Sequence, residues 1–199
     1  MLPLSFYRRT DVVALAKDLL GKKLCTLIDG KFTSGIIVET EAYAGLNDKA
    51  SHSSGGRRTP RTEPMFAEGG IAYVYLCYGI HHLFNIVTGE EGNPTAILIR
   101  GIEPIDGIDV MLERRKATVL KPALTAGPGA AMMAMGITTA LTKASLLGPE
   151  IWIEEGVRVK AAQIVAGSRV GVAYAKEDAY LPYRFSIAGN PYVSKGKGL

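Results

Sequence analysis

Cysteine is scarce in this sequence, and long apolar runs are absent. The two cysteines, Cys25 and Cys77, lie in separate strand-like segments without C-x-x-C spacing, so neither a disulfide framework nor a zinc knuckle is indicated. No apolar stretch approaches the roughly 18 residues that a membrane-spanning helix needs, and the first ten residues lack the apolar core of a signal peptide. We therefore expect a soluble, cytoplasmic protein without a membrane partner.

Histidine is also rare, with three residues in the chain. His81 and His82 are adjacent and would point to opposite faces of a strand, so they cannot readily bind one metal ion. No H-E-x-x-H motif or carboxylate cluster accompanies them. The sequence therefore predicts no metal site.

The composition is that of an ordinary globular protein. Of the 199 residues, 47% are hydrophobic and 21% are charged, which predicts one folded domain over residues 1–199 with its own core. The net charge is +4, and Arg57, Arg58 and Arg61 fall together in one polar loop, which suggests nucleic-acid binding. The alternative is that these charges simply form a solvated face.

Periodicity and turn residues indicate an α+β domain. Asp29-Gly30 predicts a tight hairpin, and Gly79 separates two further strands, whereas residues 44–71 read as a long loop. We expect helices at 11–20, 106–116 and from 130, strands at 22–28, 31–43, 72–79, 81–89, 95–104, 151–155, 157–162, 168–174 and 183–189, and a flexible tail from about 194. Hairpin-connected strands with inserted helices favour a mainly antiparallel sheet.

The strand that ends at Tyr43 carries two carboxylates. Side chains alternate along a strand, so Glu39, Glu41 and Tyr43 share one face next to the long loop. A carboxylate beside an aromatic ring is a candidate general base. A solvated strand face is the alternative interpretation.

Tyrosines are dense in the two strands around Gly79. Tyr73 and Tyr75 share a face, whereas Tyr78 has the opposite parity and lies where the chain turns. One ring can then line a pocket while another projects from the surface, which is the pair that a base-flipping enzyme needs. The alternative is ordinary packing of aromatic rings in the core.

Two polar residues interrupt the apolar strands that follow. Asn85 and Arg100 are each flanked by apolar residues, and polar groups buried there need partners. Either residue is therefore a candidate for a binding or catalytic site. Otherwise Asn85 satisfies backbone groups, and Arg100 pairs with Glu39 or Glu103.

Read together, these segments resemble the alkyladenine (3-methyladenine) DNA glycosylase family. The resemblance extends from the first helix to about residue 194. It is carried by ETEAY at 39–43, ASH at 50–52, TPR at 59–61, MF at 65–66, YVYLCYG at 73–79, Asn85, LIRGIEP at 98–104, GPG at 127–129 and RVGVAY at 169–174. It implies a curved, mainly antiparallel sheet with a protruding hairpin that enters the minor groove of DNA.

The resemblance also implies roles for individual residues. Glu41 would activate water and Arg100 would help to hold it. Tyr78 would be the intercalating wedge. The residues around the flipped base would be Tyr43, His52, Tyr75 and Asn85, the last of which would crowd the exocyclic amine of guanine.

The implied function is a monofunctional DNA glycosylase, a monomer that needs no cofactor and excises damaged purines from double-stranded DNA. The pocket segments contain no candidate lysine nucleophile, so hydrolysis without strand cleavage is expected. Arg57, Arg58 and Arg61 are the candidate DNA contacts. Two alternatives stay open, a non-catalytic nucleic-acid-binding module and a hydrolase of free purine nucleosides.

Overall fold

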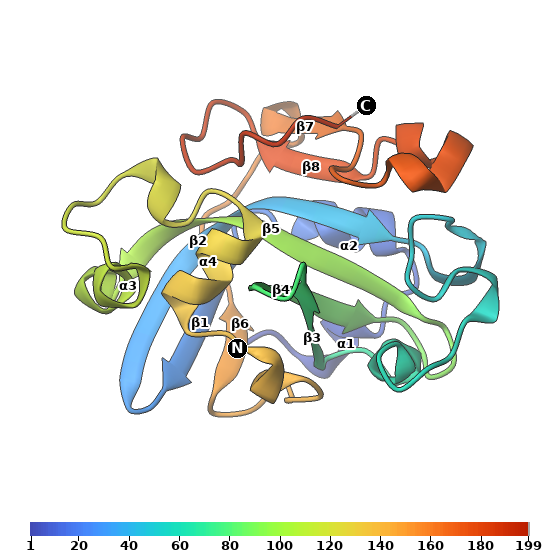
Figure 1. The fold of residues 1–199 in the computed structure, drawn as a ribbon, viewed down its shortest axis with the longest axis horizontal. Helices are drawn as coiled ribbons and strands as arrows, with labels where there is room; N and C mark the ends of the chain where they lie inside the picture. The colour runs from blue at the N-terminus through green and yellow to red at the C-terminus, as the bar shows by residue number, and fades with distance from the viewer. Residues whose placement is uncertain (199) are drawn as a thin grey trace.

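The fold is a curved antiparallel sheet with helices packed against it, as the sequence predicts (Figure 1). The structure is a computed structural model that describes residues 1–198. The helices are α1 (Leu4–Tyr7), α2 (Val12–Asp18), α3 (Ile108–Arg115) and α4 (Pro128–Met135). The strands are β1 (Lys23–Ile28), β2 (Lys31–Tyr43), β3 (Ala72–Cys77), β4 (His81–Thr88), β5 (Thr95–Asp106), β6 (Ile151–Glu154), β7 (Ile164–Gly167) and β8 (Arg184–Ile187).

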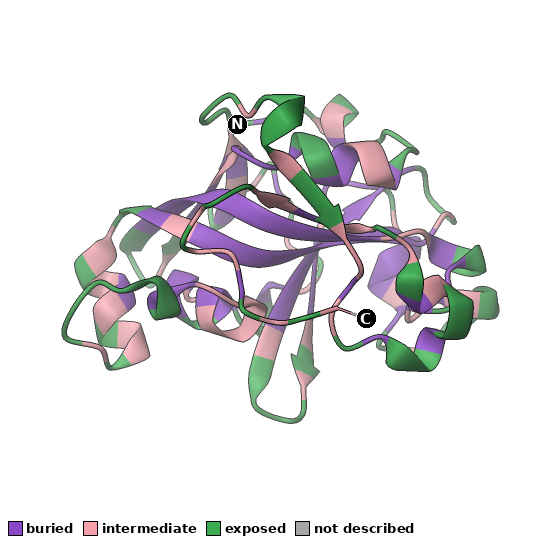
Figure 2. Ribbon diagram, turned by 90° about the horizontal axis from the view of Figure 1, so that it is seen from above, coloured by how far each residue is buried: buried purple, intermediate pink, exposed green. Residues whose placement is uncertain are grey.

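The sheet runs in the order β3-β4-β5-β2-β1-β6, and β8 joins it by pairing with both β2 and β7. Helix α4 packs on β4 and β5 in front of the sheet in Figure 1, whereas α2 packs on β2 and β5 behind it. Figure 2 shows the central strands buried along most of their length, with exposed residues concentrated in loops and strand ends. The long strands β2 and β5 therefore lie at the centre of the sheet, and helices pack on both of its faces.

Local sequence signals explain two of the turns and caps. The Asp11 side chain accepts a hydrogen bond of 2.9 Å from the backbone N–H of Ala14 and so caps α2. Asp29 and Gly30 have φ values of 53° and 71°, the conformation that a tight two-residue hairpin requires. The helix and the β1–β2 hairpin predicted from these residues are thus confirmed.

The turn between β3 and β4 is less usual. Tyr78 has φ 51° and is followed by Gly79 with φ 72°, so a bulky residue takes up the left-handed conformation at the tip of the hairpin. Cys77 and His81 form the last pair of the ladder, which leaves residues 78–80 as the exposed turn. The backbone itself therefore directs the Tyr78 ring away from the sheet.

Two of the predicted strands are wrong, and one observed strand was missed. Residues 157–162 lie outside the sheet, because this exposed segment bonds to Gly21 through Val157 instead of pairing with a strand edge. Residues 168–174 are also not a strand, since Gly171 with φ 77° interrupts the extended backbone. The missed strand is β7.

A buried ion pair fixes the long loop after β2. Arg169 and Asp48 are almost fully buried, and Arg169 Nη2 lies 2.8 Å from Asp48 Oδ1. Arg169 also donates to the carbonyl oxygens of Ala42 and Asp178, at 2.9 Å and 3.1 Å. The start of the loop, the end of β2 and the C-terminal part of the chain are therefore joined at one guanidinium.

Arg169→Met is expected to lower the free energy of unfolding by about 3–5 kcal/mol, because it leaves the Asp48 carboxylate buried without its cation. Urea unfolding followed by circular dichroism measures the change. The control is Arg58→Ala, which removes the exposed Arg58–Glu63 ion pair and should change stability little. Similar small losses for both variants would show that the Arg169–Asp48 pair does not secure the loop.

Candidate functional site

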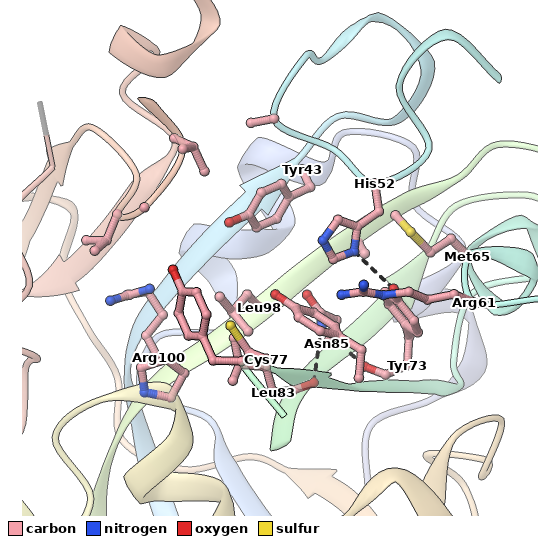
Figure 3. Close-up of a pocket in the computed structure, with 18 of the residues that line it drawn as sticks. Tyr43, His52, Arg61, Met65, Tyr73, Cys77, Leu83, Asn85, Leu98 and Arg100 are labelled. Atoms are coloured by element: carbon pink, nitrogen blue, oxygen red, sulfur yellow. Dashed lines mark hydrogen bonds between the residues drawn. The ribbon is translucent and has the colours of Figure 1, made fainter. Parts of the chain in front are cut away.

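A cavity of about 400 Å³ opens between the β3–β4 hairpin, β5, the end of β2 and the segment around Val170 (Figure 3). The site candidates that line it are Tyr43, His52, Arg61, Tyr75, Tyr78, Asn85 and Arg100. Aliphatic side chains such as Leu83 and Leu98 complete its walls. The long loop after β2, which carries His52 and Arg61, and the start of α4 at Pro128 also contribute, so residues from six separate segments of the sequence meet around one space.

One wall of the cavity is aromatic. The His52 ring meets Tyr75 edge-on, with centroids 4.7 Å apart and an interplanar angle of 75°. The Tyr73 and Tyr75 rings lie 5.5 Å apart, so the shared strand face that the sequence predicts for them is confirmed. His52 Nδ1 lies 3.0 Å from the Tyr73 hydroxyl, which fixes the orientation of the imidazole. The rings of His52, Tyr73 and Tyr75 therefore contact one another along this wall of the cavity.

His52 is neutral at physiological pH. Burial lowers its pKa from 6.5 to about 4, and the positive charges of Arg61 and Arg57 contribute further. The imidazole therefore adds no positive charge to the aromatic wall.

Glu41 lies beside the cavity and is fully buried. Its Oε2 accepts a hydrogen bond of 2.9 Å from the Tyr43 hydroxyl, and its Oε1 accepts one of 2.8 Å from the backbone N–H of Val170. Arg100 Nη1 is 3.3 Å from the same Oε1. Glu41 itself does not line the cavity, whereas Tyr43 and Arg100 do. The Glu41 carboxylate is thus connected to the cavity by its contacts with Tyr43 and Arg100.

The two side chains that contact Glu41 from the cavity, Tyr43 and Arg100, both keep their protons. Burial raises the pKa of the Tyr43 phenol well above its usual value, and the negative charge of Glu41 raises it further, so the phenol stays a donor. Burial alone would lower the pKa of Arg100, but Glu41 and Glu39 more than offset this effect, so the guanidinium stays charged. The site therefore combines a buried carboxylate, a neutral phenol and a fixed cation.

Arg100 also pairs with Glu39, which is one of the two structural partners that the sequence suggests for it. Its Nε lies 3.0 Å from Glu39 Oε1. The pairing with Glu39 and the position at the cavity are both present in the structure, so Arg100 connects a buried network with the open site.

Asn85 lies on the floor of the cavity and bonds to the backbone at the same time. Its Nδ2 donates to the carbonyl oxygen of Tyr73 at 3.2 Å. This bond fixes the amide, and the residue still lines the open space.

The tip of the β3–β4 hairpin lies at the edge of the cavity. Tyr78 is 90% exposed and Ile80 66% exposed, although Tyr78 also contributes to the lining. Large side chains that are this exposed beside a cavity are typical of surfaces that contact other molecules.

The three arginines of the polar loop lie in different surroundings. Arg61 stacks on Tyr75, with its guanidinium carbon 4.9 Å from the ring centroid, and so belongs to the cavity. Arg58 forms two hydrogen bonds with Glu63, of 2.8 Å and 2.7 Å. Arg57 is exposed near the mouth of the cavity, in a shallow neighbouring groove. The predicted cluster is therefore divided, with Arg61 at the cavity, Arg57 in the neighbouring groove and Arg58 outside both.

Comparison with known proteins identifies the family. Residues 5–191 match the family model described as methylpurine-DNA glycosylase (MPG). The chain belongs to the methylpurine-DNA glycosylase family. Its members are N-glycosylases, a class of hydrolases.

Similar proteins of bacterial origin carry the name "Putative 3-methyladenine DNA glycosylase". One from Chlamydia felis (strain Fe/C-56) is 48% identical over 188 residues, which covers 94% of this chain and 96% of the relative. Another from Bacillus thuringiensis (strain Al Hakam) is 47% identical over 202 aligned residues, covering 97% and 98%. Similarity over nearly the full length of both proteins confirms the resemblance drawn from the motifs.

Metal-ligating side chains do not gather into a metal site in residues 1–198 of this methylpurine-DNA glycosylase family member. These residues contain no group of three or more histidine, cysteine, aspartate or glutamate side chains that could hold a metal ion. Nor does that part of the chain contain a helix long and apolar enough to cross a membrane.

Residues that the sequence did not single out support the site of this family member. Arg169 lies under the Tyr43 ring, 4.9 Å from its centroid, and the backbone N–H of Val170 holds Glu41. Both belong to the RVGVAY segment, so the motif pointed to the region without revealing these contacts. Ser194, the first residue of the segment predicted to be flexible, is buried and hydrogen-bonded to Glu39.

Acid is expected to destabilise the protein through His52. As the pH falls from about 6.5 to 4, the imidazole gains a proton in the unfolded chain before it does so in the folded protein, so stability is lost over this range. Above pH 6.5 both states are neutral and the contribution is fully present. Urea unfolding between pH 4 and 7 should therefore show a steeper loss for the parent than for His52→Gln, and NMR titration should place the pKa near 4. An imidazole that titrates near 6.5 in the folded protein would contradict the assignment.

Proposed function

We propose that this protein is a monofunctional DNA glycosylase that flips damaged purines out of duplex DNA and hydrolyses their N-glycosidic bond, leaving an abasic site. The observation that carries the proposal is the buried Glu41 carboxylate, joined to Tyr43 and Arg100 at the edge of an aromatic cavity with an exposed tyrosine on its rim. Membership of the methylpurine-DNA glycosylase family supports it.

The aromatic wall suits a positively charged base. Alkylation of a purine ring nitrogen gives the base a positive charge, and the faces of Tyr43 and Tyr75 attract cations. The neutral state of His52 adds no further positive charge to a cavity that Arg61 and Arg100 already line. Asn85, fixed on the floor by its bond to the Tyr73 carbonyl, is suited to crowd the exocyclic amine of an undamaged guanine.

Glu41 is the proposed general base. Its Oε2 accepts one hydrogen bond from Tyr43 within the described residues, and a carboxylate oxygen has a second lone pair that is free to accept a proton from water. The water oxygen forms a bond to C1′ of the sugar, the C1′–N bond breaks, and its electron pair leaves with the purine. The negative carboxylate also stabilises the positive charge that develops on the sugar.

Arg100 is proposed to hold the attacking water, because it lines the cavity and touches Glu41. Among residues 1–198, no lysine lines the cavity. An amine nucleophile is the group that would form a Schiff base with the sugar, so we propose hydrolysis without strand cleavage.

Tyr78 is the proposed wedge. The exposed ring at the hairpin tip has the size and position to fill the gap that a flipped base leaves in the stack. The net charge of +4 and the three exposed arginines Arg57, Arg58 and Arg61 favour contact with the DNA backbone. The Arg58–Glu63 pair is exposed, so Arg58 can exchange Glu63 for a phosphate at low cost.

A product assay tests the proposal. A duplex with a single methylated purine should release the free base and keep an intact abasic strand, whereas the free methylated nucleoside should be a much poorer substrate. Comparable turnover of the nucleoside would indicate a nucleoside hydrolase. Binding without release of a base would indicate a non-catalytic module.

Glu41→Gln should abolish most of the excision, because loss of a general base removes roughly 10²–10⁴ in rate. Affinity for the lesion duplex should stay within a few-fold, since Glu41 does not line the cavity. Single-turnover release and equilibrium binding measure the two effects. The matched control is Glu103→Gln, on the neighbouring strand β5 and bonded to Asn190, which should leave the rate unchanged. Excision by Glu41→Gln at the parent rate would remove Glu41 from the mechanism.

Tyr78→Ala should weaken excision strongly from a well-paired duplex and less where the lesion is mispaired. The wedge offsets an unstacking cost of a few kcal/mol, and a mispaired base needs less of this work. Tyr75→Ala, which removes part of the cavity wall, should impair both substrates alike. An equal loss on paired and mispaired duplexes for Tyr78→Ala would show that this ring is not a wedge.

A further inference from the structure

The Arg100 guanidinium has a separate partner for each of its three nitrogens. Nε donates to Glu39 Oε1 at 3.0 Å, Nη1 lies 3.3 Å from Glu41 Oε1, and Nη2 donates to the hydroxyl of Ser194 at 3.2 Å. A planar guanidinium held at all three nitrogens cannot rotate without losing a contact. The orientation of Arg100 toward Glu41 is therefore set by groups on the side away from the general base.

Ser194 links two of these groups. Its hydroxyl donates to Glu39 Oε1 at 2.9 Å while it accepts from Arg100, and its backbone N–H donates to Glu39 Oε2 at 2.7 Å. Glu39 is fully buried and Ser194 is 9% exposed, so water competes little for these bonds. A residue near the C-terminus thus holds both the carboxylate and the guanidinium.

The chain around Ser194 is fastened to the sheet on both sides. Arg184 donates to Glu39 Oε1 at 2.7 Å, to the carbonyl oxygen of Gly196 at 2.8 Å and to that of Ser194 at 3.3 Å. At Gly101, a Cβ atom would lie 2.6 Å from the carbonyl oxygen of Tyr192, so the missing side chain lets this segment pack directly on β5. The C-terminal segment, residues 190–198, therefore crosses the sheet beside Arg100.

We propose that the C-terminal segment positions Arg100 against Glu41 through the hydroxyl of Ser194. Ser194 is a positioning residue, because it acts through Arg100 and does not line the cavity. This inference rests on the proposed function, since glycosidic hydrolysis is the step in which Arg100 and Glu41 act together. Its consequence is that the C-terminal segment affects the chemical step and leaves lesion binding unchanged.

The test compares Ser194→Ala with two matched variants. Ser194→Thr keeps the hydroxyl. Asn190→Ala removes two other bonds of the same segment, the 2.7 Å bond to Glu103 on β5 and the 2.9 Å bond from the backbone N–H of Tyr192, without touching Arg100. We expect Ser194→Ala to lower the single-turnover rate by roughly 10- to 100-fold, the order of loss for a catalytic group misplaced by about an ångström. Affinity for the lesion duplex should be unchanged, and Ser194→Thr and Asn190→Ala should stay close to the parent.

Side-chain NMR gives a second readout that does not depend on activity. The Arg100 Nη2 protons, which donate to the Ser194 hydroxyl and are assigned by their absence in Arg100→Lys, should be protected from exchange in the parent and in Asn190→Ala, and should lose this protection in Ser194→Ala. Retained protection, or equal loss of rate in Ser194→Ala and Asn190→Ala, would overturn the inference. If the parent releases no methylated base at all, the proposed function fails, and the NMR comparison still decides whether Ser194 positions Arg100.

Discussion

The placement of Arg100 between two buried carboxylates is the interaction on which the site depends. Glu39 and Glu41 lie on the same face of β2, and neither is exposed to solvent. Two buried negative charges this close are unfavourable unless a cation and further hydrogen bonds compensate them. Arg100 supplies the cation from the neighbouring strand, and Arg184 and Ser194 complete the set of donors around Glu39. Glu41 is thereby kept in a defined position beside the cavity.

The two carboxylates differ in their contacts. Glu39 takes most of the hydrogen bonds, whereas Glu41 keeps the contacts that face the cavity, with Tyr43 and Arg100. Arg169 adds a second fixed charge beneath the Tyr43 ring, and its pairing with Asp48 holds the long loop that carries His52. The aromatic cavity therefore has two buried arginines next to it, Arg169 against the Tyr43 ring and Arg100 against Glu41.

Local patterns were enough to predict much of the fold and the shape of the site. Strand alternation placed Glu41 beside Tyr43 and separated Tyr75 from Tyr78, because these relations depend on neighbours within a few residues. The Ser194–Glu39 bond joins residues 155 positions apart, and the Arg169–Asp48 pair joins residues 121 positions apart. No local spacing signals such contacts. The mistaken strand at 157–162 failed for a related reason, since β-rich composition does not reveal whether a strand edge is available as a partner. The one at 168–174 failed because Gly171 interrupts the extended backbone.

The most direct test of the central claim identifies what attacks C1′ of the sugar. A duplex with one methylated purine is incubated with the protein in the presence of borohydride, and the strand, the free base and the protein are analysed by mass spectrometry. If Glu41 and Arg100 direct a water molecule to the sugar, the purine should be released, the strand should stay intact and the protein should carry no added mass. A cleaved strand, or a covalent adduct between protein and sugar that borohydride traps, would contradict the account.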